Sequence, residues 1–119
     1  MPKRLPPIHP GEHLKEFMDD FGLTMNQLAK ALRVSPNRVT AIIHGTRGIT
    51  AETAMRLARY FGTSAEMWMN MQAHYEMEVA RDEFQAAILK EIQPRRSAAA
   101  EGAMRTAARF DAMGGIAAG

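Results

Sequence analysis

The chain has 119 residues, of which 46% are apolar and none is cysteine. We therefore expect one small domain with extensions, and neither disulfides nor thiolate metal sites. No apolar run approaches the roughly 18 residues that a membrane span needs, and the N-terminus lacks the apolar stretch of a signal peptide. These features predict a cytoplasmic protein without membrane contact.

The net charge of +2 is unevenly distributed along the chain. Residues 24–62 carry six basic residues and one acidic residue, a net charge of +5. The flanking segments are acidic, with −3 over residues 9–23 and −4 over residues 63–93. A basic middle segment indicates a polyanionic partner and the acidic flanks indicate a different one, unless the pattern is chance.

The first two predicted elements are helices, and no stretch of the chain alternates like a strand. A helix over 11–21 has one apolar face and ends at Gly22. A second helix over 24–32 opens with a capping box, because Thr24 can cap the helix and Gln27 can reach back to it. The fold class is therefore all-α.

The third predicted helix follows a tight turn over 33–35. Ser35 can cap its N-terminus, Pro36 suits the first helical position, and Gly45 ends it. Two short helices joined by such a turn form a helix-turn-helix.

The fourth helix is expected at 51–61 with Thr50 as its cap, and the fifth over 64–93, with a pattern that weakens after 81–83. The Met, Trp and Tyr stripe of the fifth helix is the candidate dimer interface. Residues after 94 are rich in Ala, Gly and Arg, with helical character around 98–110. The predicted segments are an arm at 1–8, a helix-turn-helix domain at 9–80, a continuation of the last helix at 81–93 and a tail at 94–119.

The polar face of the third helix predicts DNA binding. In a helix-turn-helix the second helix enters the major groove, where Asn pairs with adenine, Arg with guanine, and Thr or Ala contacts a thymine methyl. Helix N-termini and flanking arginines can contact phosphates. The predicted DNA-binding residues are Thr24, Gln27, Arg33, Ser35, Asn37, Arg38, Thr40, Ala41, His44 and Arg47.

Several polar residues also fit purely structural roles. Ser35 can be a helix cap only, and His44 can simply favour the helix dipole. Arg56 fits an ion pair with Glu52 or Glu66 better than a DNA contact. His9 and His13 have a metal-ligand spacing, but Pro10 and Gly11 between them make a helix doubtful, and a third ligand is not evident. No phosphate loop or activated nucleophile is present, so neither an enzyme, a cofactor nor a metal is predicted.

The region from about residue 8 to 80 resembles the HigA-type antitoxins of bacterial toxin–antitoxin modules, within the Cro/repressor-like helix-turn-helix group. The similar pieces are HPGE (9–12), QLAKAL (27–32), VSPNRVTAIIHG (34–45), RGITAETAMRLARYFGTS (47–64) and MWMNMQ (67–72).

This resemblance implies a five-helix domain and a homodimer. It also implies repression of the protein's own promoter through a palindromic operator, and neutralisation of a partner toxin that is usually an mRNA-cleaving nuclease. The alternatives are a repressor without a toxin partner and a protein-interaction module. The sequence departs from the family at Arg33, where Gly is frequent, and in the tail from 94 onward. A positive φ at Arg33 would cost about 1–2 kcal/mol.

Overall fold

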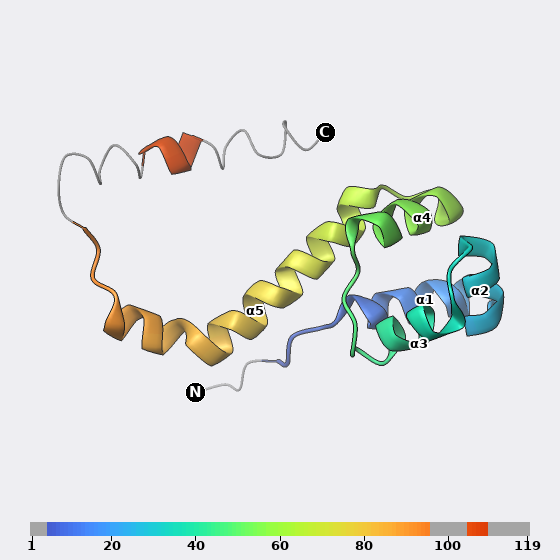
Figure 1. The fold of residues 1–119 in the computed structure, drawn as a ribbon, viewed down its shortest axis with the longest axis horizontal. Helices are drawn as coiled ribbons and strands as arrows, with labels where there is room; N and C mark the ends of the chain where they lie inside the picture. The colour runs from blue at the N-terminus through green and yellow to red at the C-terminus, as the bar shows by residue number, and fades with distance from the viewer. Residues whose placement is uncertain (1–4, 96–104, 110–119) are drawn as a thin grey trace. The chain divides into compact units, whose positions relative to one another are not determined.

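The computed structural model describes residues 5–95 and 105–109, and every regular element in them is α-helical. The helices are α1 (Pro10–Phe21), α2 (Met25–Leu32), α3 (Pro36–Ile43), α4 (Ala51–Phe61) and α5 (Ala65–Glu91) (Figure 1). A short helical segment covers 105–109. The all-α prediction is confirmed. The structure describes the predicted arm only at residues 5–8 and the predicted tail only at residues 94–95 and 105–109, and the rest of these two segments lies outside the described residues.

The chain divides into two units, residues 1–83 and 84–119. The boundary falls inside α5, at the point where the apolar sequence pattern begins to weaken, although the helix itself continues to Glu91. In the described part of the chain, every helix is too short or too polar to cross a bilayer.

Local capping explains where the helices begin. The Thr24 hydroxyl accepts the Gln27 N–H at 3.1 Å, and the Gln27 side chain accepts the Thr24 N–H at 2.9 Å, which completes the predicted capping box. The Ser35 hydroxyl accepts the Arg38 N–H at 3.3 Å, and Thr50 caps α4 in the same way. Each cap satisfies a backbone donor that the helix leaves free.

The start of α1 differs from the sequence interpretation. Pro10 and Gly11 make a helix doubtful in the sequence, yet α1 begins at Pro10. His9 is the N-cap, and its Nδ1 accepts the Gly11 N–H at 2.9 Å. Pro10 fits because the first helical position has no intrahelical partner for its N–H.

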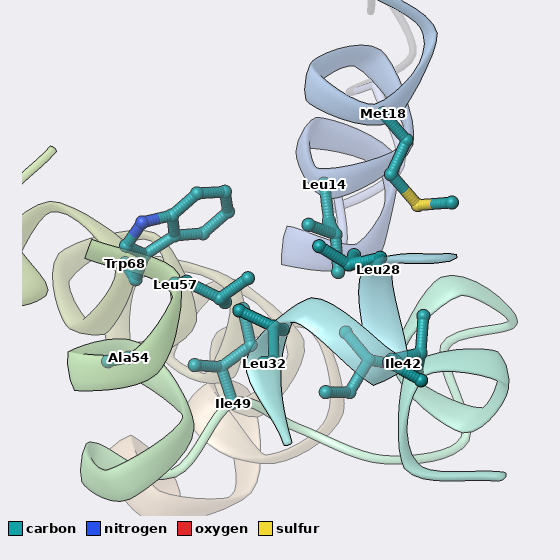
Figure 2. Packing of buried hydrophobic residues seen from close by; sticks show 11 residues of the cluster. Leu14, Met18, Leu28, Leu32, Ile42, Ile49, Ala54, Leu57 and Trp68 are labelled. Atoms are coloured by element: carbon teal, nitrogen blue, oxygen red, sulfur yellow. The ribbon is translucent and has the colours of Figure 1, made fainter. Parts of the chain in front are cut away.

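The core lies where all five helices meet (Figure 2). Trp68 of α5 is fully buried, and its Nε1 donates to the Thr63 hydroxyl at 2.8 Å. Burying one large apolar side chain contributes about 1.5–3 kcal/mol. The buried apolar residues are Leu14, Met18, Leu28, Ala29, Leu32, Val39, Ile42, Ile49, Ala54, Leu57 and Trp68.

The N-terminal part of the α5 stripe therefore belongs to the core. Met67, Met69 and Met71 pack against the buried cluster beside Trp68, and Tyr75 contacts the ring of His9. This part of the candidate dimer interface is thus used within the protomer.

Gly11 lies where α1 approaches the end of α3. A Cβ atom at this position would be 1.9 Å from the Ile42 carbonyl oxygen and 3.0 Å from His9 Nδ1. The Ile42 carbonyl belongs to helix backbone and cannot move aside alone. The absence of a side chain at Gly11 is therefore a packing requirement between α1 and α3.

We expect Gly11→Ala to lower the free energy of unfolding by about 3 kcal/mol, the upper range for overpacking. Gly22→Ala is the matched control, because Gly22 has φ +66° and no heavy atom within 4 Å of the added Cβ. The control should lose only about 1 kcal/mol from backbone strain. Urea denaturation of both variants measures the difference, and equal losses would contradict the packing role of Gly11.

Candidate DNA-binding site

The face of α3 opposite the core is accessible. Val39 and Ile42 point into the core, while Asn37 and His44 are exposed and Ala41 is half-buried. Successive helical residues are separated by 100°, so Asn37, Ala41 and His44 share one face. We name these three residues the α3 face.

Arg38 and Thr40 lie at the two margins of the α3 face. The Thr40 hydroxyl donates to Met25 Sδ at 3.5 Å, which turns it toward α2. Arg38 Nη1 donates to Glu52 Oε1 of α4 at 2.7 Å. The structure thus places both side chains beside the predicted reading surface, with each one engaged by a neighbouring helix.

Glu52 joins α3 and α4 through its ion pair with Arg38, and Arg56, its second ion-pair partner, connects the pair to α2. Arg56 Nε lies 3.5 Å from the same Oε1 atom, an ion pair without hydrogen-bond geometry. Arg56 Nη1 donates to the Leu32 carbonyl at the end of α2, at 2.9 Å. The hydrogen bond from Arg38 and the nearby charge of Arg56 lower the pKa of Glu52. The prediction that Arg56 is an internal ion-pair partner is confirmed.

The turn between α2 and α3 depends on a left-handed residue. Arg33 has φ 61° and ψ 41°, and its N–H donates to carbonyls at the end of α2. It is the only non-glycine residue with positive φ in the described part of the chain. This is the strain expected from the sequence, and its cost is about 1–2 kcal/mol for an L-residue. The side chain of Arg33 is exposed beside α3.

The loop after α3 carries Arg47. The Ala41 carbonyl accepts the N–H groups of Thr46 and Arg47 at 3.0 and 3.2 Å, and the Thr46 hydroxyl at 3.2 Å. The side chain of Arg47 is exposed. The loop therefore has a defined conformation next to the C-terminal end of α3.

Gln72 of α5 supports the same loop, a role that the sequence does not predict. Its Oε1 accepts the buried Ile49 N–H at 2.7 Å. Its amide also lies so close to Gly48 that a Cβ there would be 2.8 Å from Nε2. A contact across 23 residues leaves no local pattern in a sequence, and the one sequence signal for Gln72 is its place in the motif at 67–72.

His9 also ties the loop to α5. Its ring meets the ring of Tyr75 edge-on, with centroids 4.8 Å apart. Burial lowers the pKa of His9 below its usual 6.5, although the charge of Glu12 and a hydrogen bond with the Arg47 backbone act in the opposite direction. The neutral imidazole is therefore the form that the fold favours.

We expect the protein to lose stability as the pH falls below about 6.5, because the unfolded state then binds a proton that His9 in the folded state accepts less readily. The loss is complete once the pH is below the lowered pKa of His9. His9→Asn keeps a side-chain oxygen for the Gly11 N–H but cannot titrate, so it should flatten this dependence. Thermal melts between about pH 8 and pH 5 measure it, and an unchanged slope in His9→Asn would contradict the role of His9.

The ten predicted DNA-binding residues fall into three groups. The N-terminus of α2 carries Thr24 and Gln27, exposed but bound to each other. The turn and the loop contribute Arg33, Ser35 and Arg47, and α3 with its C-cap His44 supplies the remaining five. Within the described residues, no group of three His, Asp or Glu side chains could hold a metal ion. The fold and this surface define a helix-turn-helix DNA-binding protein.

Comparisons with known proteins identify the family within this class. A family model described as helix-turn-helix matches residues 14–68. An addiction module antidote protein of the HigA family from Coxiella burnetii is 47% identical, with a TM-score of 0.72 over 76% of this chain and 100% of its own. The chain belongs to the HigA family of antitoxins.

Two further relatives are similar over much of their length. The Pseudomonas aeruginosa antitoxin HigA, solved with the higBA promoter, is 45% identical, with a TM-score of 0.73 over 76% of this chain and 99% of its own. Virulence-associated protein I of Dichelobacter nodosus is 49% identical over 83 residues, 69% of this chain and 77% of its own length. The relatives are antitoxins and regulators rather than enzymes, which agrees with the sequence prediction.

Proposed function

We propose that this protein is a DNA-binding antitoxin that represses its own operon and neutralises a toxin encoded beside it. The observation that carries the proposal is the exposed α3 face, surrounded by basic residues in the segment with a net charge of +5. The structure of the P. aeruginosa relative with its promoter supports DNA as the partner.

The geometry supports two kinds of DNA contact, with some residues of the site contacting bases and others contacting phosphates. Asn37 and Ala41 lie on the α3 face, with Thr40 and Arg38 at its margins, and we assign base contacts to them. Arg33 and Arg47 lie in the segments that flank α3, and His44 lies at the C-terminal end of the α3 face; these three residues suit phosphates. The N-termini of α2 and α3, at Thr24, Gln27 and Ser35, offer backbone N–H groups to phosphates.

A homodimer on a palindromic operator completes the proposal. One recognition helix contacts few base pairs, so specificity is usually reached with two half-sites one helical turn apart. Four large apolar side chains near the end of α5 are 49–69% exposed, and their spacing places three of them on one helix face. We propose that a second copy of the chain covers these residues, which are Phe84, Ile88, Leu89 and Ile92.

The acidic part of α5 is the proposed toxin contact. Glu76, Asp82 and Glu83 are exposed, and residues 63–93 carry a net charge of −4. A basic toxin would be attracted to this surface without competing for the basic helix-turn-helix face.

We expect Asn37→Ala to weaken binding to a duplex from the protein's own promoter by about 5- to 150-fold, because a bidentate base contact contributes about 1–3 kcal/mol of discrimination. Its binding to a scrambled duplex should change less. Arg47→Ala should weaken both duplexes alike and lower the salt slope by about one, as a phosphate contact does. Salt titrations by fluorescence anisotropy measure both effects.

Melting temperature is the control for these two variants, because neither side chain belongs to the core. If both variants bind the promoter duplex like the wild type, α3 is not the recognition helix.

We expect the protein to co-purify with the product of the neighbouring reading frame. Replacing Asp82 and Glu83 together by Lys should weaken that complex about fivefold or more at low salt, since each exposed charge contributes up to about 1 kcal/mol. Affinity for promoter DNA should stay equal or rise. Promoter binding without any complex with the neighbouring product would favour a repressor that has no toxin partner.

A further inference from the structure

Glu52 is the only acidic residue among residues 24–62, which contain six basic residues. It lies in the first turn of α4, and its side chain is 62% exposed. A carboxylate beside a DNA-binding surface repels phosphates and reduces affinity for DNA of any sequence. Glu52 also forms an ion pair with Arg38 at the margin of the α3 face. It can therefore affect DNA binding through its negative charge and through the conformation of Arg38.

The ion pair with Glu52 restricts the conformation of Arg38. The side chain of Arg38 is 25% exposed and its Nη1 is bound at 2.7 Å. A free arginine loses considerable rotamer entropy when it is fixed in a contact. Arg38 is already fixed before DNA arrives. The guanidinium has five N–H donors in one plane, so those not used by Glu52 are presented in a defined direction.

The position of the carboxylate is itself held. Arg56 lies 3.5 Å from Glu52 Oε1 and donates to the Leu32 carbonyl at 2.9 Å. Arg38 is therefore oriented with respect to α4 and to the end of α2 as well as to its own helix. This anchoring matters because a base contact requires correct direction, whereas a phosphate attracts any nearby cation.

We propose that Glu52 determines specificity by positioning Arg38, so that it increases discrimination between the operator and other DNA while it lowers affinity for DNA outside the operator. This rests on the proposed function, since it assumes that α3 contacts an operator. Without Glu52, Arg38 is free to follow the phosphates of any duplex.

The test is Glu52→Gln in the full chain, measured on a duplex from the protein's own promoter and on a scrambled duplex of equal length and composition. We expect scrambled DNA to bind about twofold tighter at low salt, from the Coulomb energy of one charge about 10 Å from a phosphate. The ratio of the two affinities should fall about fivefold or more, the lower end for a base contact.

Two additional variants distinguish positioning of Arg38 from a simple charge effect. Glu16→Gln removes the same charge from an exposed position on α1 and should leave the ratio unchanged. In the Arg38→Ala background, Glu52→Gln should not lower the ratio further, because the residue that Glu52 positions is absent.

A purely structural role of Glu52, as an acid at the N-terminus of α4, would lower the melting temperature and weaken both duplexes equally, which would overturn the proposal. An unchanged ratio would overturn it as well. If the wild type binds both duplexes equally, the proposed function itself is overturned. If the wild type discriminates and Glu52→Gln discriminates equally well, only the role of Glu52 fails.

Discussion

The contact between the first turn of α1 and the last turn of α3 determines where α3 lies. No side-chain atom fits between Gly11 and the Ile42 carbonyl. The residue before this turn, His9, caps α1 and also contacts α5 and the loop that follows α3. One short segment therefore fixes the end of α3, the loop that carries Arg47, and the helix that closes the core.

The surface proposed to bind DNA is supported from behind by residues that do not belong to it. Gln72 holds the Ile49 N–H, and Trp68, one turn earlier on α5, fills the core. On the other side, Arg56 joins the end of α2 to Glu52 and, through it, to Arg38. Interactions of this kind keep short helices in place, because an eight-residue helix is not stable by itself in water.

Features with a local cause could be predicted from the sequence. The capping box of Thr24 and Gln27 and the cap by Ser35 depend on residues three positions apart, and the structure confirms both. The positive φ at Arg33 agrees with the family pattern, in which glycine is frequent at this position. The all-α fold follows from the same signals, since each helix is delimited by its own cap and stop.

Features that depend on tertiary contacts could not be predicted in detail. The ion pair of Arg38 with Glu52 joins residues 14 apart in the sequence, and the Gln72 contact joins residues 23 apart. From the sequence, the stripe that includes Trp68 is a candidate dimer interface, whereas its N-terminal part lies in the core. Periodicity shows that a helix face is apolar but does not show which surface covers it. The DNA contacts of the ten residues stay a prediction.

The left-handed turn at Arg33 places two opposing physical requirements on one residue. Folding alone favours glycine there, because glycine adopts φ 61° without a Cβ penalty. Attraction to a polyanion favours a cation, because the side chain is exposed beside α3. Under the proposed phosphate contact of Arg33, arginine retains a positive charge at the expense of a less stable turn, so a change to glycine would increase thermal stability and decrease affinity for DNA.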